Sequence, residues 1–177
     1  MGASEAYFPW LSLIVLIPAL GALIMPFLPL KEEAESNLPR NFAISFLFID
    51  FFLIIGVFTK LYDSQISGIQ LVERVPWVPF IGLEWSLGVD GLSAPLVVLS
   101  GLITLLSAAA SWKINSKSKL YFALLLVQAS AQALVFLSQD FLLFFLSWEL
   151  ELVPVYLLIA IWGGKRRLYA ATKFILY

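Results

Sequence analysis

Two acidic residues lie inside a long apolar run of the chain, FLLFFLSWELELVPVYLLIAIW at 141–162. As an α-helix, this run would be about 33 Å long, close to the thickness of the hydrocarbon core of a bilayer. Glu149 and Glu151 would then lie near the middle of the membrane, where a charge costs about 2.5–3.5 kcal/mol on insertion scales. Acids in this position normally face protein or water and are functional. Burial favours the neutral form of a carboxyl group and a nearby lysine favours the charged form, so movement of a lysine would load or release a proton.

The two glutamates cannot share one cavity, because residues two positions apart point about 200° apart around a helix. Glu149 shares its helix face with apolar residues such as Leu152, whereas Glu151 shares its face with Ser147 and Trp148. Spacing alone slightly favours the face of Glu151 as the more polar one. Either acid could instead stay protonated as a structural hydrogen-bonding group, and this alternative is stronger for Glu151.

Pro154 changes the backbone close to both acids. Proline has no N–H to donate to the carbonyl of Leu150, and its ring presses against that carbonyl, so we expect a kink in the helix. In lipid, the free carbonyl needs water or a donor from another helix. A kink, a free acceptor and buried carboxyl groups together suit a hydrated place in the interior of a bundle.

Other polar residues also fall inside apolar runs. Gln128 and Gln132 share a helix face among small residues, which is more typical of close helix packing than of a water path. Asp50 has no partner that the sequence identifies, so a structural hydrogen bond is favoured there. Lys173 could extend to the membrane surface or could pair with a glutamate.

The composition supports lipid as the solvent of this chain. Of its 177 residues, 61% are hydrophobic and 13% charged, and there is no cysteine or histidine. The missing residue types exclude disulfides, thiolate chemistry and the usual zinc or haem ligands. A glycine-rich phosphate loop is also missing, so we expect no cofactor or metal site in the chain. The net charge of −1 gives no indication of nucleic acid as a partner.

The apolar runs predict an all-α, polytopic transmembrane helix bundle, with residues 1–177 as a single membrane domain. The expected spans are 8–30, 41–59, 92–110, 120–138, 141–162 and the start of a sixth at 168–177. Because the last apolar run stops in mid-helix, we expect the N-terminal part of a longer chain, truncated after about five and a half spans. Asp90 or Ser93 is expected to cap the span that begins at 92.

The polar stretch at 60–90 is predicted to form a short β-like outer loop. In LEWSLG, apolar residues alternate with polar or small ones, which indicates strands and a hairpin that turns near Pro79 or Gly82. Trp77 and Trp85 suit the headgroup region of the membrane or a neighbouring subunit. The loop either caps the helices or contacts another subunit.

The distribution of lysine and arginine predicts the orientation in the membrane. The loops at 113–119 and 165–167 each carry three basic residues, whereas the turn at 139–140 carries none. These loops, together with Lys31 and Arg40, are expected on the inside. The N-terminus and the stretch at 60–90 are then expected on the outside.

Three motifs give the chain a resemblance to a known family. GVDGLS, SQDFLLFFLSWELELVPVYLLIAIWGG and AATKFILY resemble the antiporter-like membrane subunits of respiratory complex I, most closely in their cyanobacterial or plastid form. The resemblance covers most of the chain from about position 76. It implies that Glu149, which follows Trp148, is the main residue of proton translocation, with Glu151 secondary. Lys173 lies in a family motif, but the paired lysines of the family lie on later helices.

The resemblance implies a subunit of a proton-translocating NAD(P)H-quinone oxidoreductase, a translocase with no redox site of its own. The whole complex would use NAD(P)H or ferredoxin, iron–sulfur clusters and plastoquinone. Its partners would be the other membrane subunits and the lipid bilayer, in a thylakoid membrane with the N-terminus in the lumen. The alternatives are an Mrp-type cation/proton antiporter subunit, which would show sodium-dependent activity, and a non-transporting scaffold, in which Glu149 would be dispensable.

Overall fold

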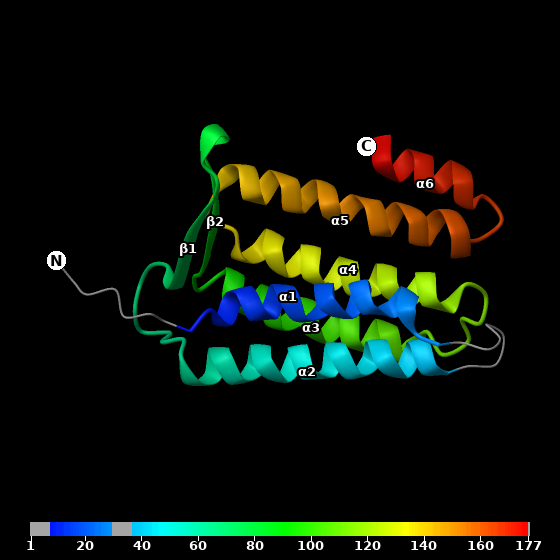
Figure 1. Cartoon of the computed structure of the whole chain (residues 1–177), viewed down its shortest axis with the longest axis horizontal. Helices are drawn as coiled ribbons and strands as arrows, with labels where there is room; N and C mark the ends of the chain where they lie inside the picture. Colours follow the sequence, from blue (N-terminus) through cyan, green and yellow to red (C-terminus); the bar gives the residue numbers. More distant parts are fainter. Residues whose placement is uncertain (1–7, 30–36, 177) are drawn as a thin grey trace.

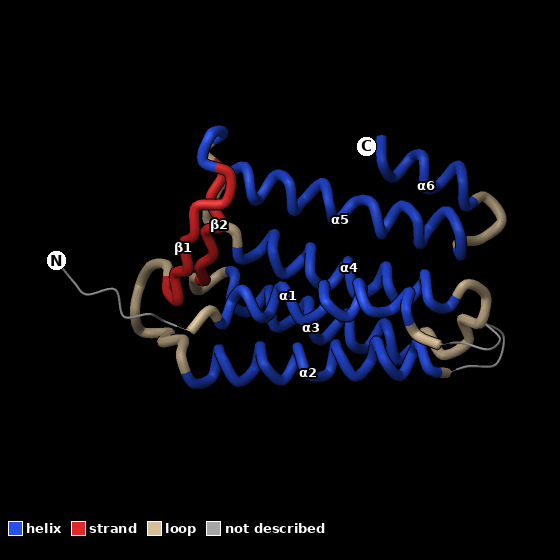
Figure 2. Tube along the Cα trace, viewed as in Figure 1, coloured by secondary structure: helices blue, strands red, loops and turns tan. Residues whose placement is uncertain are grey.

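The computed structural model describes residues 8–29 and 37–176, in which long helices lie side by side and a hairpin stands across one end (Figures 1 and 2). The elements are α1 (Trp10–Ile24), η1 (Met25–Phe27), α2 (Leu38–Lys60), β1 (Gln70–Val78), η2 (Pro79–Ile81), β2 (Leu83–Val89), α3 (Ser93–Ala110), α4 (Ser118–Leu137), α5 (Phe141–Trp162) and α6 (Arg167–Leu176). Within the described ranges, five helices are long and apolar enough to cross a membrane. The predicted helical membrane architecture with a small hairpin is confirmed.

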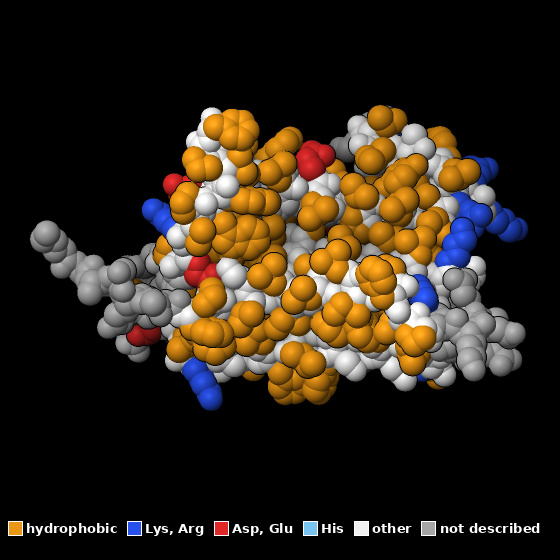
Figure 3. All heavy atoms as spheres, viewed as in Figure 1, with side chains coloured by type: hydrophobic (Ala, Val, Ile, Leu, Met, Phe, Trp, Pro, Cys, Tyr) orange, Lys and Arg blue, Asp and Glu red, His pale blue; other side chains and the backbone are white. Residues whose placement is uncertain are grey.

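The flanks of the bundle are covered by apolar side chains, as Figure 3 shows for one face. Phe27, Phe48 and Leu106, for example, expose half or more of their surface. Apolar patches of this extent are rare on soluble monomers, so lipid tails are the environment that these flanks fit. Most of the Lys and Arg side chains visible in Figure 3 lie at the end opposite the hairpin. Lys31 and residues 1–7, on which part of the orientation argument depends, lie outside the described residues.

Helix α4 is the centre of the bundle and α5 lies at its edge. The span of α4 is 56% buried and contacts α1, α2, α3 and α5, whereas the span of α5 is only 17% buried. The hydroxyl of Ser130 on α4 donates to the carbonyl of Val15 on α1 at 2.7 Å, which adds a polar contact to this packing. Small and polar residues let two helices approach closely in lipid, where apolar surface alone gives little driving force between helices.

The hairpin turns at a left-handed glycine and packs against the turn between α4 and α5. Strands β1 and β2 pair antiparallel, and Gly82 after η2 has φ of 72°, a backbone conformation that favours glycine. The turn therefore falls between Pro79 and Gly82, as predicted. On β2, Ser86 and Gly88 are buried, because the backbone N–H of Gln139 donates to the carbonyl of Ser86 at 2.8 Å and the side chain of Gln139 packs against Gly88.

A carboxylate from the hairpin caps the first helix. Glu73 on β1 accepts hydrogen bonds from the backbone N–H of Leu11 at 2.7 Å, from that of Ser12 at 3.0 Å and from the hydroxyl of Ser12 at 2.6 Å. The indole N–H of Trp85 donates to the same hydroxyl at 2.8 Å. The first N–H groups of a helix have no partner within it, and a negative charge there is favoured by the helix dipole. Glu73 therefore ties the hairpin to the start of α1.

The expected cap of the third span uses both candidate residues. Oδ1 of Asp90 accepts the backbone N–H of Ser93 at 2.8 Å and that of Leu92 at 3.0 Å, while Oγ of Ser93 accepts the backbone N–H of Asp90 at 3.0 Å. This reciprocal arrangement is a capping box. The hydrogen bond from the backbone of Ser93 lowers the pKa of Asp90 below its usual value. Asp140 caps α5 by accepting the N–H of Leu143 at 2.8 Å.

Candidate functional site

The structure joins two of the predicted polar residues across the interface between α4 and α5. Nε2 of Gln128 donates to Oε1 of Glu151 at 2.9 Å. Oε1 of Gln128 is buried and finds no hydrogen-bond partner among the residues that the structure describes. The pair is thus incomplete, since a buried acceptor without a partner is unfavourable and is readily satisfied by water or by a protonated acid.

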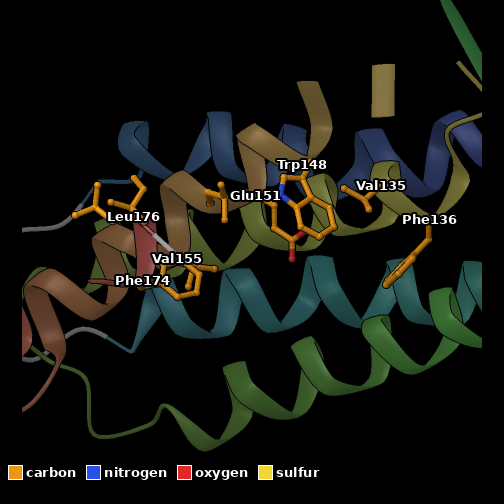
Figure 4. A pocket seen from close by; sticks show the side chains of 9 residues that line it. Val135, Phe136, Trp148, Glu151, Val155, Phe174 and Leu176 are labelled. Atoms are coloured by element: carbon orange, nitrogen blue, oxygen red, sulfur yellow. The ribbon is translucent and has the colours of Figure 1, made fainter. Parts of the chain in front are cut away.

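Glu151 lines a cavity of about 610 Å³, which we call the Glu151 cavity (Figure 4). Its walls are Val135 and Phe136 of α4, Trp148, Glu151, Leu152 and Val155 of α5, and residues 174–176 of α6. Within this lining, Glu151 is the charged residue and the others are apolar. The volume is ample for several water molecules, and the carboxyl group supplies the polar contacts that water needs. The arrangement could support proton exchange between Glu151 and water.

Glu149 lies on a different face of α5. Its side chain is exposed, and it makes no hydrogen bond within residues 8–29 and 37–176. Leu150 and Val153, close to it on the helix, are also exposed. The two acids thus have separate surroundings, as their spacing on one helix requires.

The remaining predicted residues lie apart from the Gln128–Glu151 pair. The ammonium group of Lys173 lies 5.4 Å from the centre of the Tyr169 ring, a cation–π contact along α6. Gln132 is half-buried one turn beyond Gln128, without a side-chain hydrogen bond in the described part of the chain. Pro154 is buried, and α5 continues through it to Trp162.

Asp50 is the most deeply buried acid of the described residues. It is 4% exposed and lies in the buried stripe of α2 that also includes Leu47 and Ile54. Its Oδ1 has no hydrogen-bond partner in the described ranges, so the expected structural hydrogen bond is not seen. No group of three or more His, Cys, Asp or Glu that could hold a metal ion occurs among the residues searched, 8–29 and 37–176.

A second cavity, which sequence reasoning did not anticipate, lies beside the first. It has a volume of about 310 Å³ and includes Asp90, Ser93 and Gln139 in its lining, and we call it the Asp90 cavity. These residues follow β2 and α4 at the hairpin end of the bundle (Figure 1). The sequence identified Asp90 and Ser93 only as a helix cap, because a cavity between helices depends on how they pack.

Comparison with known proteins agrees with this architecture. Residues 138–177 match the family described as NADH:quinone oxidoreductase/Mrp antiporter, transmembrane. The chain is 50% identical over 176 residues to NAD(P)H-quinone oxidoreductase chain 4 of Synechococcus sp., covering 99% of this chain and 32% of that protein. It is 53% identical over 173 residues to a chain 4 of Trichodesmium erythraeum, covering 98% and 30%. The chain therefore spans about a third of the length of these relatives.

Two solved structures share the fold. Respiratory complex I from Thermus thermophilus with bound NADH matches with a TM-score of 0.76 and 24% identity, over 94% of this chain and 32% of that one. The archaeal membrane-bound sulfane sulfur reductase matches with a TM-score of 0.75 and 18% identity, over 94% and 25%. Fold and matches together define a multi-pass helical membrane protein. Over nearly its whole length the chain is similar to the cyanobacterial chain 4 proteins, and its residues 138–177 match the NADH:quinone oxidoreductase/Mrp antiporter family.

Proposed function

We propose that this chain is part of a membrane subunit of a proton-translocating NAD(P)H-quinone oxidoreductase of the cyanobacterial type. The observation that carries the proposal is the identity of about half of all residues, over nearly the whole chain, to proteins with that name. The chain would contribute to proton translocation and not to electron transfer. Nicotinamide or ferredoxin, iron–sulfur clusters and plastoquinone would bind to other parts of the complex.

The thylakoid is the proposed membrane, with the hairpin end in the lumen. The orientation is supported by the two loops rich in lysine and arginine, at 113–119 and 165–167, which both follow helices that end opposite the hairpin. The partners would be the lipid bilayer and the other membrane subunits of the complex. The exposed edge of α5 offers them a surface, because only 17% of that span is buried within this chain.

We assign the main proton-carrying role to Glu149 and a secondary role to Glu151. Glu149 lies on the open face of α5, where another helix of the membrane arm would bring a base or an amide to its carboxyl group. Glu151 lies on the inner face, where Gln128 orients it and the Glu151 cavity gives it room for water. Lys173 remains a secondary candidate in α6. An acid that can change partners is suited to pass on a proton, whereas an unpartnered charge in lipid would be strongly unfavourable.

The test is neutralisation of each acid in the intact complex, with proton uptake measured in sealed vesicles during electron transfer. For Glu149→Gln, we expect proton uptake to fall by about a hundredfold or more, the lower end of what a proton-transfer group contributes, with the complex still assembled. Glu151→Gln should have a milder effect. Glu84→Gln, on the exposed side of β2, is the matched control. Normal proton uptake in Glu149→Gln would refute the assignment.

A second candidate is a cation/proton antiporter subunit, because the matching family includes Mrp antiporters by its description. Sodium-dependent proton movement in an assembly that purifies without redox subunits would favour this function. Strict dependence of proton uptake on quinone reduction would exclude it.

A further inference from the structure

The Glu151 cavity and the Asp90 cavity share a wall. Val135, Phe136 and Trp148 line both of them. Two of these residues carry aromatic side chains, Phe136 from α4 and Trp148 from α5. Side chains change rotamer far more easily than packed helices move, and such a wall can open without a change of fold.

The polar groups on the two sides of this wall differ in their access to water. On one side lie Glu151 and its partner Gln128, within the span of α5. On the other side lie Asp90 and Gln139, at the hairpin end, where the side chain of Gln139 is exposed. The Asp90 cavity therefore connects to the aqueous phase on the hairpin side.

Trp148 is placed to control passage between the cavities. It precedes Glu151 by three residues, so the two side chains lie on the same side of α5, and Figure 4 shows the indole over the Glu151 side chain on the side towards Val135 and Phe136. Its ring lies 6.0 Å from that of Phe144, which lines only the Asp90 cavity. About half of Trp148 is exposed within this chain.

We propose that Trp148 and Phe136 form a gate between Glu151 and the aqueous phase on the hairpin side. With the gate open, water in the two cavities becomes continuous. The carboxyl group of Glu151 can then release its proton to that water and leave a carboxylate, or take a proton back by the reverse step. This inference depends on the proposed function for its purpose, but the access route itself can be tested without measuring proton translocation.

Cysteine accessibility tests the gate directly, because the chain has no cysteine of its own. Glu151→Cys is introduced into the intact complex in sealed vesicles of known orientation. A charged, membrane-impermeant methanethiosulfonate reagent is added on the hairpin side or on the opposite side. Labelling is followed by mass spectrometry of the peptide. Gln139→Cys serves as the accessible control, and Leu106→Cys, on a flank of α3 that fits lipid tails, as the lipid-facing control.

We expect Glu151→Cys to react from the hairpin side, and Trp148→Ala in the same chain to raise its labelling rate by about tenfold, since thiol reaction rates follow access. Phe136→Ala should also raise the rate, and it keeps the test valid if Trp148→Ala does not assemble. Leu106→Cys should stay unlabelled in every background. The proposal is overturned if Glu151→Cys reacts only from the opposite side. It is also overturned if neither alanine substitution changes the rate while Gln139→Cys reacts normally. If Glu151→Gln lowers proton uptake but neither alanine substitution changes the labelling of Glu151→Cys, the gate is refuted and the proposed function is not.

Discussion

Glu73 and Glu151 are two carboxyl groups of one small bundle that are held in opposite ways. Glu73 accepts three hydrogen bonds at the start of α1, and the hydroxyl that supplies one of them is itself bound by Trp85. Glu151 accepts one hydrogen bond, from Gln128, whose own carbonyl oxygen is buried without a partner in the described residues. The first site lies at the hairpin end and the second within a membrane span.

The difference separates a structural acid from the acid for which we propose proton exchange. A carboxylate with several short hydrogen bonds is held firmly in place, because each hydrogen bond to a charged group contributes about 1.5–3 kcal/mol. A carboxyl group with one hydrogen-bond partner lies here beside a cavity that can hold water. Gaining or losing a proton, or exchanging that partner for water, therefore costs it little free energy. The hydrogen bonds of Glu73 therefore fix the hairpin against the helices. The incomplete hydrogen bonding of Glu151 and Gln128 suits the role that we propose for Glu151.

The largest expected effect is at Glu73. Removal of its carboxylate by Glu73→Ala leaves the first N–H groups of α1 and the hydroxyl of Ser12 without their acceptor. We expect the local stability of the first turn of α1 to fall by about 3 kcal/mol, or roughly a hundredfold in protection from hydrogen exchange. Exchange mass spectrometry on the intact complex measures this. Glu84→Ala, an exposed acid of the same hairpin, is the control and should have little effect. Unchanged protection in Glu73→Ala would remove the distinction between the two acids.

A smaller effect is expected at the Gln128–Glu151 pair. Replacement of both partners by leucine, Gln128→Leu with Glu151→Leu, removes one hydrogen bond and one unsatisfied buried acceptor together. Because such paired replacement can be nearly neutral, we expect local stability around α4 and α5 to stay within about 1 kcal/mol of the wild type. The same exchange experiment measures it, with Gln132→Leu as the control. A loss as large as that of Glu73→Ala would show that Glu151 is also a structural acid.

The smallest effect is expected from Asp90, which extends the comparison to a third acid. Its pKa is lowered in the folded protein, mainly by the backbone N–H of Ser93. Asp90 therefore stabilises the first turn of α3 fully at pH values above about 3.9, the pKa of an aspartate in the unfolded chain. This stabilisation is lost as the pH falls through the lower pKa that Asp90 has in the folded protein. Protection factors for residues 91–96 should decline below about pH 4 in the wild type and show no such decline in Asp90→Asn, since asparagine caps a helix without titrating. A pH profile that is the same in both proteins would contradict this role.

Much of the architecture could be predicted, because it depends on local pattern. Runs of apolar residues of membrane length indicated the spans, and the turn residues Pro79 and Gly82 indicated the hairpin. The cap formed by Asp90 and Ser93 also followed from sequence, since a cap involves residues three positions apart. Glu73 could not be identified in this way, because its partners Leu11 and Ser12 are about sixty positions earlier in the chain.

The candidate site shows the same division. The sequence determined that two acids lie within one membrane-length helix and that they must face different surroundings, because helical geometry fixes the angle between them. The packing of α5 against α4 and α6 alone decided which of the two acids contacts Gln128. The same packing left the other acid on the open edge of the bundle. The shared aromatic wall between the two cavities arose in the same way. Contacts between helices depend on the rotation of each helix about its axis, and in an apolar segment with few polar residues the local sequence leaves that rotation open.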